Sequence, residues 1–472
     1  MMMHEDIAAF ALDYVQKKGA TYAEVRVEDT TAHSTVMKNG VVEATGFDKY
    51  HGIGIRFIVK NKMGFVSTNE LTKNKIKPMI LKAVRTTKGL KSLGQKTFFA
   101  EEKSHNATYE VKQKIKLADL SIQERIAYLQ QGEKAMLDSG VAVPSRYVGY
   151  SDHDTKEFLI NSDGSKIYSH VPKLNMYYFL TIAEAGKMTQ RYWAYGGAGG
   201  WEIAKGWDIP KILHEEVTSM KDNLVNGVKS PKGQMPIICG PQVTGIMCHE
   251  SVGHPYEADR ILGREAAQAG ESFVTEKMIG RKIASDIVTV VDDPTIANSY
   301  GYYQYDSEGV KARRKFLIKD GHIKEFLHNR ETAYKMGVTS NGSARASDYD
   351  KEGIVRMSNT FLLPGKLEEE ELFEGVKKGV FLKNFMEWNI DDRRLNQKYT
   401  GAEAYLIENG KITKPIIHPV LEVTTTKLWP AVDAIANNLE LHSGECGKGE
   451  PMQGIPALLG GPSMRLQGLR IK

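Results

Sequence analysis

Cysteine is scarce in this chain of 472 residues, which contains only Cys239, Cys248 and Cys446. An odd count this small argues against a disulfide framework and suits a reducing compartment. The sequence therefore predicts free thiols, one of which can instead serve as a ligand.

Long hydrophobic runs are also missing. Residues 1–6 carry no Lys or Arg, and the apolar stretch that follows them is short and interrupted. Neither a signal peptide nor a membrane span can be read from such a start, so we expect a cytoplasmic protein with no membrane partner.

Clustered positive charge is absent too. The chain has 63 Lys and Arg against 58 Asp and Glu, a formal net charge of +5. The basic residues are spread out rather than gathered in a tract with interleaved aromatics, so nucleic acid is not an indicated partner. The glycine-rich stretch 195–200 lacks the GxxxxGK(S/T) pattern of a phosphate-binding loop, and we expect a tight turn there that lines a functional site.

What is present is an ordinary soluble composition, 41% hydrophobic and 26% charged, long enough for two or three domains. Helical periodicity or capping signals mark four segments of the first half: residues 5–18, 71–88, 121–138 and 208–226. Period-two alternation predicts strands that fold into hairpins, one of them across Asn39-Gly40. A mostly antiparallel sheet with helices is the expected fold of residues 1–228.

The second half reads mainly as short strands, with helical periodicity at residues 368–378 and 431–437. We therefore predict an α+β protein with two domains. The C-terminal domain, residues 229–472, is expected to be sheet-rich and barrel-like and to carry a helix with the main chemical motif of the chain.

That motif, residues 247–255 (MCHESVGHP), puts two imidazoles and a carboxylate within six positions. Imidazole nitrogen is a good zinc ligand, and a neighbouring carboxylate can take a proton from water that the metal activates, so this set is typical of enzymes that hydrolyse amides or esters.

The usual zincin spacing, HExxH, is one residue shorter, and on an ideal helix His249 and His254 would lie about 140° apart. Because Gly253 tolerates unusual dihedral angles and Pro255 disfavours the α region at His254, we predict a helix that breaks at His254.

HExxxH alone is a weak signal, because composition produces it by chance in roughly a few per cent of chains of this length. The alternative is a chance motif in which one histidine satisfies a hydrogen bond in the core and Glu250 is solvated.

Further blocks follow the motif in a fixed order. They are Val290–Asp293, Asp306–Gly309, Asn359–Thr360 with Leu363–Gly365, Glu403–Lys411 and Cys446–Lys448. Together with His249–His254 they resemble the TldD branch of the TldD/PmbA metallopeptidase family. The resemblance covers essentially the whole chain and is densest from about residue 235 to the end.

The resemblance implies a peptidase that cleaves small or unfolded peptides inside a closed two-subunit shell, in bacteria usually a TldD–PmbA heterodimer. The PmbA (TldE) branch lacks the metal motif, so an intact motif assigns this chain to the catalytic branch. It implies His249, His254 and Cys446 as protein ligands of one Zn²⁺ per catalytic subunit, and Glu250 as the base. Three protein ligands leave one position open, as in catalytic zinc sites. The expected assembly is a homodimer or a heterodimer with a PmbA/TldE-like subunit.

The resemblance is weaker in residues 387–396, which depart from the more glycine-rich sequence that the family has in this segment. This region is expected to line the substrate path, so substrate preference does not transfer. In the loop 340–349, Arg345 and Tyr349 are candidates for transition-state or substrate contacts, because the family has a basic residue there. A solvated loop arginine is the alternative.

Two other functions fit the same residues. One is a non-enzymatic binding or modulator protein in which zinc organises a surface. The other is a cysteine hydrolase with Cys446 as nucleophile and a histidine as base, which thiol alkylation would block and chelators would not affect.

Sequence proximity and the resemblance name different cysteines as the ligand. Adjacent helical side chains diverge by about 100°, so Cys248 and His249 would not converge on one ion, and a lone helical cysteine is commonly a small buried hydrophobe. Cys446 lies in a glycine-flanked stretch, residues 443–449, expected to be a loop near the helix break in which Lys448 favours the thiolate. We therefore predict Cys446 as the ligand; an exposed free thiol in a flexible tail is the alternative.

Overall fold

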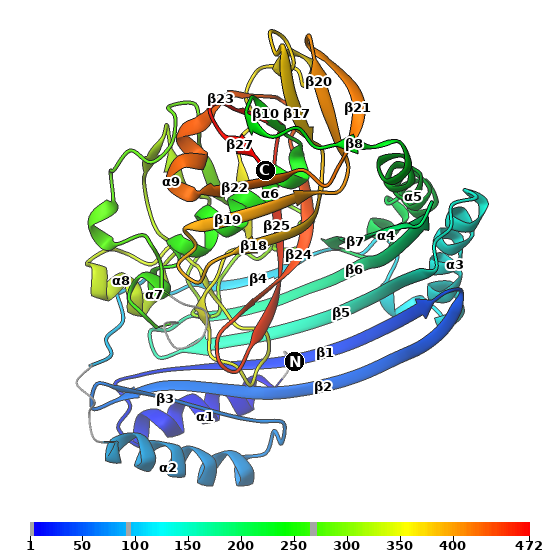
Figure 1. Ribbon diagram of the computed structural model, residues 1–472. Helices are drawn as coiled ribbons and strands as arrows, with labels where there is room; N and C mark the ends of the chain where they lie inside the picture. Colours follow the sequence, from blue (N-terminus) through cyan, green and yellow to red (C-terminus); the bar gives the residue numbers. More distant parts are fainter. Residues whose placement is uncertain (1–3, 91–95, 265–270) are drawn as a thin grey trace.

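The computed structural model describes residues 4–90, 96–264 and 271–472. Its first half is organised on a seven-stranded sheet with the order β3-β2-β1-β5-β6, in which β4 and β7 both pair with β6 (Figure 1). The strands are β1 (Tyr22–Lys38), β2 (Val41–Val59), β3 (Lys62–Thr68), β4 (Asn106–Glu110), β5 (Ser145–Asn161), β6 (Lys166–Glu184) and β7 (Lys187–Ala198). Every pairing is antiparallel except that of β4 with β6, which confirms the predicted class of sheet.

Tight turns set the register of this sheet. Asn39 and Gly40 have φ of 49° and 80°, and Lys38 pairs with Val41 directly across them. Positive φ at both central residues suits the right-handed twist of a hairpin and is tolerated best by Asn and Gly. The predicted hairpin at this turn is confirmed.

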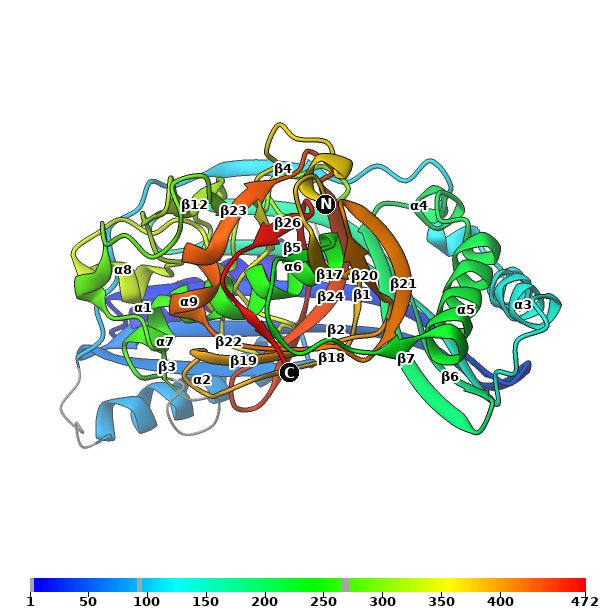
Figure 2. The same ribbon diagram turned by 45° about the horizontal axis from the view of Figure 1, so that its top comes forward.

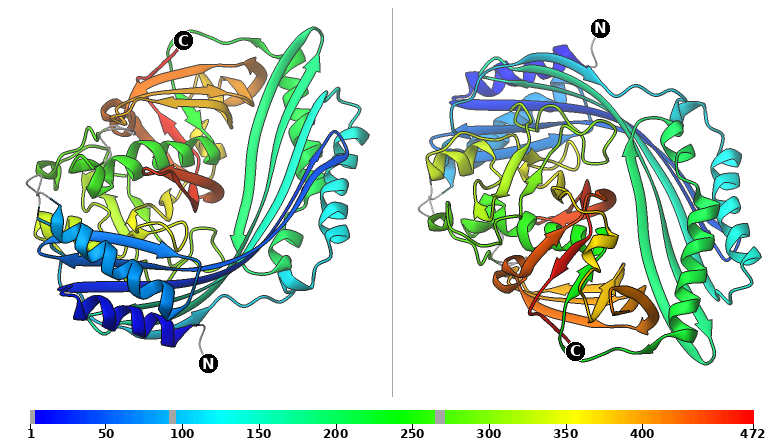
Figure 3. Two further views of the ribbon diagram at one scale, coloured as in Figure 1. Left: turned by 90° about the horizontal axis from the view of Figure 1, so that it is seen from below. Right: turned by 90° about the horizontal axis from the view of Figure 1, so that it is seen from above.

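Helices cover the outer side of the sheet at both ends. α1 (Glu5–Lys17) and α2 (Lys73–Gly89) pack on β1–β3, and α3 (Ile122–Asp138), α4 (Trp201–Lys205) and α5 (Ile209–Asn226) lie at the other end. The concave side of the sheet curls around the C-terminal half (Figure 3). Four of these five helices fall where the sequence predicts helices, and the predicted capping box of α3 is present between Ser121 and Glu124.

The C-terminal half consists of smaller sheets that surround the motif helix, α6 (Pro241–Cys248) (Figure 2). A seven-stranded sheet contains, in order, β23 (Val432–Ile435), β26 (Met464–Leu466), β10 (Ile237–Cys239), β17 (Lys378–Leu382), β20 (Ala404–Glu408), β21 (Lys411–Ile417) and β8 (Val228–Lys229). A six-stranded sheet contains β13 (His322–Ile323), β12 (Lys315–Lys319), β11 (Val290–Asp292), β16 (Asn359–Leu362), β25 (Gln453–Gly461) and β24 (Glu440–Lys448). A five-stranded sheet contains β18 (Phe385–Ile390), β19 (Asn396–Gly401), β22 (Val420–Thr424), β27 (Arg470–Ile471) and β9 (Gly233–Gln234), and β14 (Ala344–Arg345) pairs with β15 (Ile354–Val355).

The two helices predicted late in the chain are wrong. In residues 368–378 only a short 3₁₀ turn, Glu370–Leu372, forms, because Gly375 adopts a left-handed conformation (φ 74°) and ends it. Residues 431–437 contain strand β23, in which Val432 and Ala434 are buried on either side of the exposed Asp433. This segment forms a strand because it pairs with β26, although its local sequence pattern favours a helix.

The glycine-rich stretch 195–200 is mostly strand rather than turn. Gly196 and Gly197 belong to β7, and only Gly199, with φ of 150°, turns the chain toward α4. A Cβ on Gly196 would lie 2.9–3.0 Å from Tyr300 and Ser443, so the glycine serves close packing of β7 on the C-terminal half.

α5 ends at Asn226, and β8, which pairs with β21 of the second half, begins at Val228. The predicted boundary between residues 228 and 229 falls inside β8 and stays a prediction. Within the described ranges, the structure contains no helix with the length and apolar character needed to cross a membrane.

Candidate metal centre

A π turn brings the two motif histidines onto one face. Regular helix α6 ends at Cys248, and residues His249–Gly253 form a π turn in which the amide of His254 donates to the carbonyl of His249, five residues back. A π turn has one residue more than an α turn, so side chains five apart are aligned instead of diverging. The rings of His249 and His254 consequently face each other edge-on, with centroids 4.9 Å apart.

This geometry corrects the predicted helix break. His254 keeps α-region angles (φ −59°, ψ −47°), as does Gly253 (φ −56°, ψ −65°), so neither Pro255 nor glycine flexibility opens the helix there. Glycine is required at 253 for space, because a Cβ would lie 1.8 Å from the sulfur of Met357. Ser251 supports the turn by donating from Oγ to the Met247 carbonyl at 2.6 Å.

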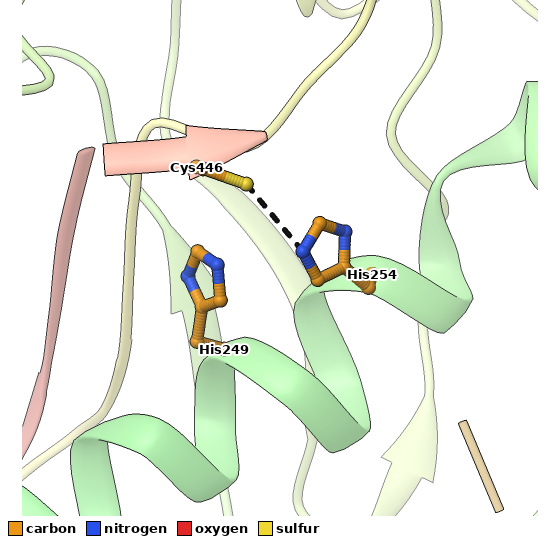
Figure 4. A group of neighbouring side chains, drawn as sticks. All are labelled: His249, His254 and Cys446. Atoms are coloured by element: carbon orange, nitrogen blue, oxygen red, sulfur yellow. Dashed lines mark hydrogen bonds between the residues drawn. The ribbon is translucent and has the colours of Figure 1, made fainter. Parts of the chain in front are cut away.

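Cys446 reaches the histidines from a strand and not from the predicted loop or exposed tail. It lies in β24 and pairs with Ile455 of β25, the strand on which α6 packs through Gly245 and Gly460. Its Sγ is 3.4 Å from His254 Nε2 (Figure 4). One ligand atom from each of His249, His254 and Cys446 lies within 4.8 Å of the other two.

The three side chains fit a metal such as zinc. Two imidazole nitrogens and a thiolate sulfur are donors that zinc takes, and in a tetrahedral site they would lie about 3.3–3.6 Å apart. The 3.4 Å separation of Cys446 and His254 is already in this range. His249 Nδ1 is buried and has no hydrogen-bond partner among the described residues. All three cysteines of the chain are free thiols, and Cys248 is not part of the group.

Glu257, which sequence reasoning missed, orients His254. Its Oε2 is 3.0 Å from His254 Nδ1, a contact that leaves Nε2 directed at Cys446. Burial alone would raise the pKa of Glu257, but Lys448 and His254 hold it well below the usual range. A carboxylate behind a ligating histidine fixes its tautomer and raises its basicity. The spacing of three residues from His254 is the sequence signal that could have indicated this partner.

The charges around Cys446 favour its thiolate. Burial alone would raise the pKa of this thiol, but the charges of His254, Arg356 and His249 hold it well below the usual value. Arg356 also donates to the backbone carbonyl of Cys446. The predicted helper, Lys448, instead binds Glu257 and Asp259, at 3.2 and 2.7 Å.

Glu250 stands next to the histidine pair and is held by the hairpin of β18 and β19. Trp388 Nε1 donates to its Oε1 at 3.3 Å, and Arg394 Nη1 donates to its Oε2. These two donors come from residues 387–396, the segment in which the family resemblance is weakest. No local sequence pattern places them near Glu250, because 138 and 144 residues separate them from it.

The candidates Arg345 and Tyr349 are not part of the histidine–cysteine group. Arg345 is buried in β14, not solvated, and donates to the carbonyls of Met357 and Pro456 at 2.7 and 2.8 Å. Burial lowers the pKa of its guanidinium. The ring of Tyr349 lies over Gly52 of the N-terminal sheet.

The whole group is nearly closed to solvent. Exposed fractions are 6% for His249, 6% for Glu250, 4% for His254 and 3% for Cys446. Only a small part of each side chain is therefore open to a substrate.

Comparisons with known proteins identify the family of this chain. The family model described as the PmbA/TldA metallopeptidase C-terminal domain matches residues 232–472, and those of domain 1 and the central domain match residues 23–87 and 115–221. The chain belongs to the PmbA/TldA metallopeptidase family. A metalloprotease of Methanocaldococcus jannaschii is 32% identical over 94% of this chain and 95% of its own length.

Two further relatives extend the comparison. A zinc metalloprotease TldD homolog of Saccharolobus solfataricus is 25% identical over 97% of this chain and 98% of its own length. The crystal structure of TldE from Thermococcus kodakarensis has the same fold, with a TM-score of 0.76, 18% identity and coverage of 98% of this chain and 99% of that one. The two sequence relatives are named as metalloproteases, and the His–His–Cys group together with the zinc named for one of them supports a metal site in this chain.

Proposed function

We propose that this chain is a zinc-dependent peptidase of the TldD branch that hydrolyses small or unfolded peptides. His249, His254 and Cys446 would hold the ion, one per catalytic subunit, and Glu250 would act as the base. The observation that supports this most is the π turn, which aligns both histidines with Cys446 while keeping Glu250 beside them.

Zinc bound to these residues would polarise the scissile carbonyl and lower the pKa of water at the site. Glu250 accepts a proton from the attacking water as the C–O bond forms, and then passes it to the nitrogen of the leaving amine as the peptide C–N bond breaks. Glu257 keeps His254 in the tautomer whose Nε2 is free to bind the ion.

Replacing Glu250 tests this function. Glu250→Ala should retain zinc and lose about 10²–10⁴-fold in kcat on unstructured peptides, because the loss of a general base costs that much. Glu276→Ala, at an exposed position, is the matched control and should behave like the wild type. A Glu250→Ala protein that binds zinc and cleaves at the wild-type rate would exclude Glu250 as the base.

Chelation separates the proposal from the modulator alternative. Removal of metal should abolish cleavage of unfolded casein or a peptide library, and zinc should restore it. A chain that holds zinc but cleaves none of these would be the non-enzymatic binding protein.

The short contact between Cys446 Sγ and His254 Nε2 also fits a cysteine hydrolase, since it is the arrangement of a nucleophile and its base. Alkylation decides between the two. In a zinc enzyme, bound metal protects Cys446 from alkylation. In a cysteine hydrolase, the metal-free chain would be fully active, and alkylation would inactivate it.

We further propose a two-subunit assembly in the cytoplasm, either a homodimer or a heterodimer with a PmbA/TldE-like subunit. The fold shared with TldE and the near-complete burial of the site support an enclosed arrangement. Light scattering of the purified chain checks this, and a strictly monomeric preparation with full activity would contradict it. A reducing compartment keeps the Cys446 thiol available.

A further inference from the structure

The hairpin of β18 and β19, residues 385–401, is a fixed neighbour of Glu250. β19 pairs with β18 on one side and β22 on the other, within the five-stranded sheet. Trp388 packs edge-on against Phe385, with ring centroids 5.7 Å apart. The hairpin is therefore part of the folded body, and it presents Trp388 and Arg394 to the proposed base.

Both carboxylate oxygens of Glu250 are occupied by these two donors. The bond from Arg394 is charge-assisted, and it competes with the proton that a general base accepts. Proton transfer to Glu250 is therefore favoured when Arg394 leaves this carboxylate for an anion of the substrate. The guanidinium needs such an anion, because an unpaired charge in a mostly buried site is costly.

Arg394 differs from the other cations around the site. Arg356 and Lys448 are fully buried, and each donates to at least two acceptors of the C-terminal half. In the ranges that the structure describes, the Arg394 guanidinium has Glu250 as its one hydrogen-bond acceptor, and its Nε has none. The side chain also remains 17% exposed. A ligand can thus reach Arg394, whereas the other two cations maintain the fold.

We propose that Arg394 is a specificity-determining residue that takes the C-terminal carboxylate of the peptide, so that this chain removes residues from the ends of peptides. The inference rests on the proposed role of Glu250 as base. A terminal carboxylate matches a guanidinium with two parallel hydrogen bonds. Because Arg394 touches Glu250, a carboxylate bound there lies beside the base, which places the scissile bond close to the end of the peptide.

Three peptides test the proposal: a free acid, the C-terminal amide of the same sequence, and that amide with its last residue replaced by Asp. The wild type should favour the free acid in kcat/KM by on the order of 10- to 100-fold, the value of hydrogen bonds to a charged group. Arg394→Gln should abolish this preference by slowing the free acid alone and mainly through KM, and Arg394→Lys should restore part of it. Arg393→Gln changes the exposed neighbour in the same turn and should keep the full preference.

Other outcomes overturn the assignment. Equal cleavage of acid and amide by the wild type, or equal slowing of both by Arg394→Gln, would leave Arg394 as a residue that only positions Glu250. Equal cleavage of the free acid and the Asp-ended amide would show recognition of an acidic side chain instead of the chain terminus.

Calorimetry separates failure of this inference from failure of the proposed function. Glu250→Ala, which frees Arg394, should bind the free acid more tightly than the amide, and Glu250→Ala/Arg394→Gln should not distinguish them. Selective binding without any cleavage by the wild type would overturn the peptidase and leave Arg394 as a carboxylate site. Cleavage without selectivity would retain the peptidase and overturn the role of Arg394.

Discussion

The choice between two cysteines is the sharpest question at the scale of single residues. Cys446 Sγ contacts His254, whereas Cys248 is buried outside the group and burial raises the pKa of its thiol. We expect X-ray absorption of the zinc-loaded protein to show one sulfur at about 2.3 Å from the metal. Cys446→Ser should lose this signal and most activity, and Cys248→Ser should keep both. The opposite pattern would reassign the ligand.

Glu257 provides a second test at this scale. Glu257→Gln keeps the size of the side chain but removes the charge that faces His254 Nδ1. We expect zinc affinity to fall by about 10–100-fold, the usual effect of losing such a partner. Competition with a chromophoric chelator measures it, with Glu276→Gln as the control. Unchanged affinity would mean that Glu257 serves the buried contacts with Lys448 and Arg260 alone.

The sequence identified the residues that share a local motif or a family block, and the structure brings His249, His254 and Cys446 together. Their role as ligands stays a prediction. The sequence could not identify Arg394 and Arg356, because their side chains contact site residues that are 90 or more positions away in the chain. Lys448 was assigned to the wrong partner for the same reason: on β24 it points the same way as Cys446 but ends at Glu257.

At the scale of elements, the π turn depends on the absence of a side chain at residue 253. Gly253→Ala should lower both zinc affinity and the free energy of unfolding, by about 1–3 kcal/mol for the latter, because the new methyl group meets Met357 in a packed core. The double variant Gly253→Ala/Met357→Ala should recover part of the loss relative to the sum of the single changes. Thermal unfolding and zinc stoichiometry measure the effect, and strict additivity would show that the two residues do not compete for space.

The local sequence pattern predicted helices well where the apolar residues kept a helical period over several turns, as in α1, α3 and α5. It also predicted the hairpin at Asn39-Gly40, where both residues tolerate positive φ. It failed at residues 431–437, where the strand is only four residues long and its buried positions do not alternate regularly. It also could not reveal the π turn, since hydrogen bonding between residues five apart follows from how α6 packs on β25 and from the support of Ser251.

At the scale of the whole molecule, buried charges join the curled sheet to the C-terminal half. Arg56 of β2 binds Glu24 of the same sheet at 2.8 Å and Glu308 of the second half at 2.6 Å. Arg56→Met should therefore destabilise the protein by about 3–5 kcal/mol, because two carboxylates would remain buried without their partner. Urea unfolding checks this, with Lys60→Met at an exposed position as the control. A loss below about 1 kcal/mol, the usual value of a surface pair, would show that water reaches the cluster.

Glu28 on the same concave face accepts a hydrogen bond from Thr30 but forms no ion pair within the described residues. Glu28 of β1 lies directly opposite Glu157 of β5, and burial, followed by the charges of Glu157 and Asp348, raises its pKa to about 8. In the unfolded chain a glutamate titrates near pH 4.3, so between about pH 4.3 and 8 the folded protein holds the extra proton. Stability must then fall as pH rises through this window, with a slope of up to about 1.4 kcal/mol per pH unit from this group, and level off above it.

Glu28→Gln should thus stabilise the protein at pH 8 and change it little at pH 4.5, whereas the exposed Glu101→Gln should leave the pH dependence unaltered. Urea unfolding at the two pH values measures the difference, and an equal effect of Glu28→Gln at both would mean that Glu28 is ionised throughout.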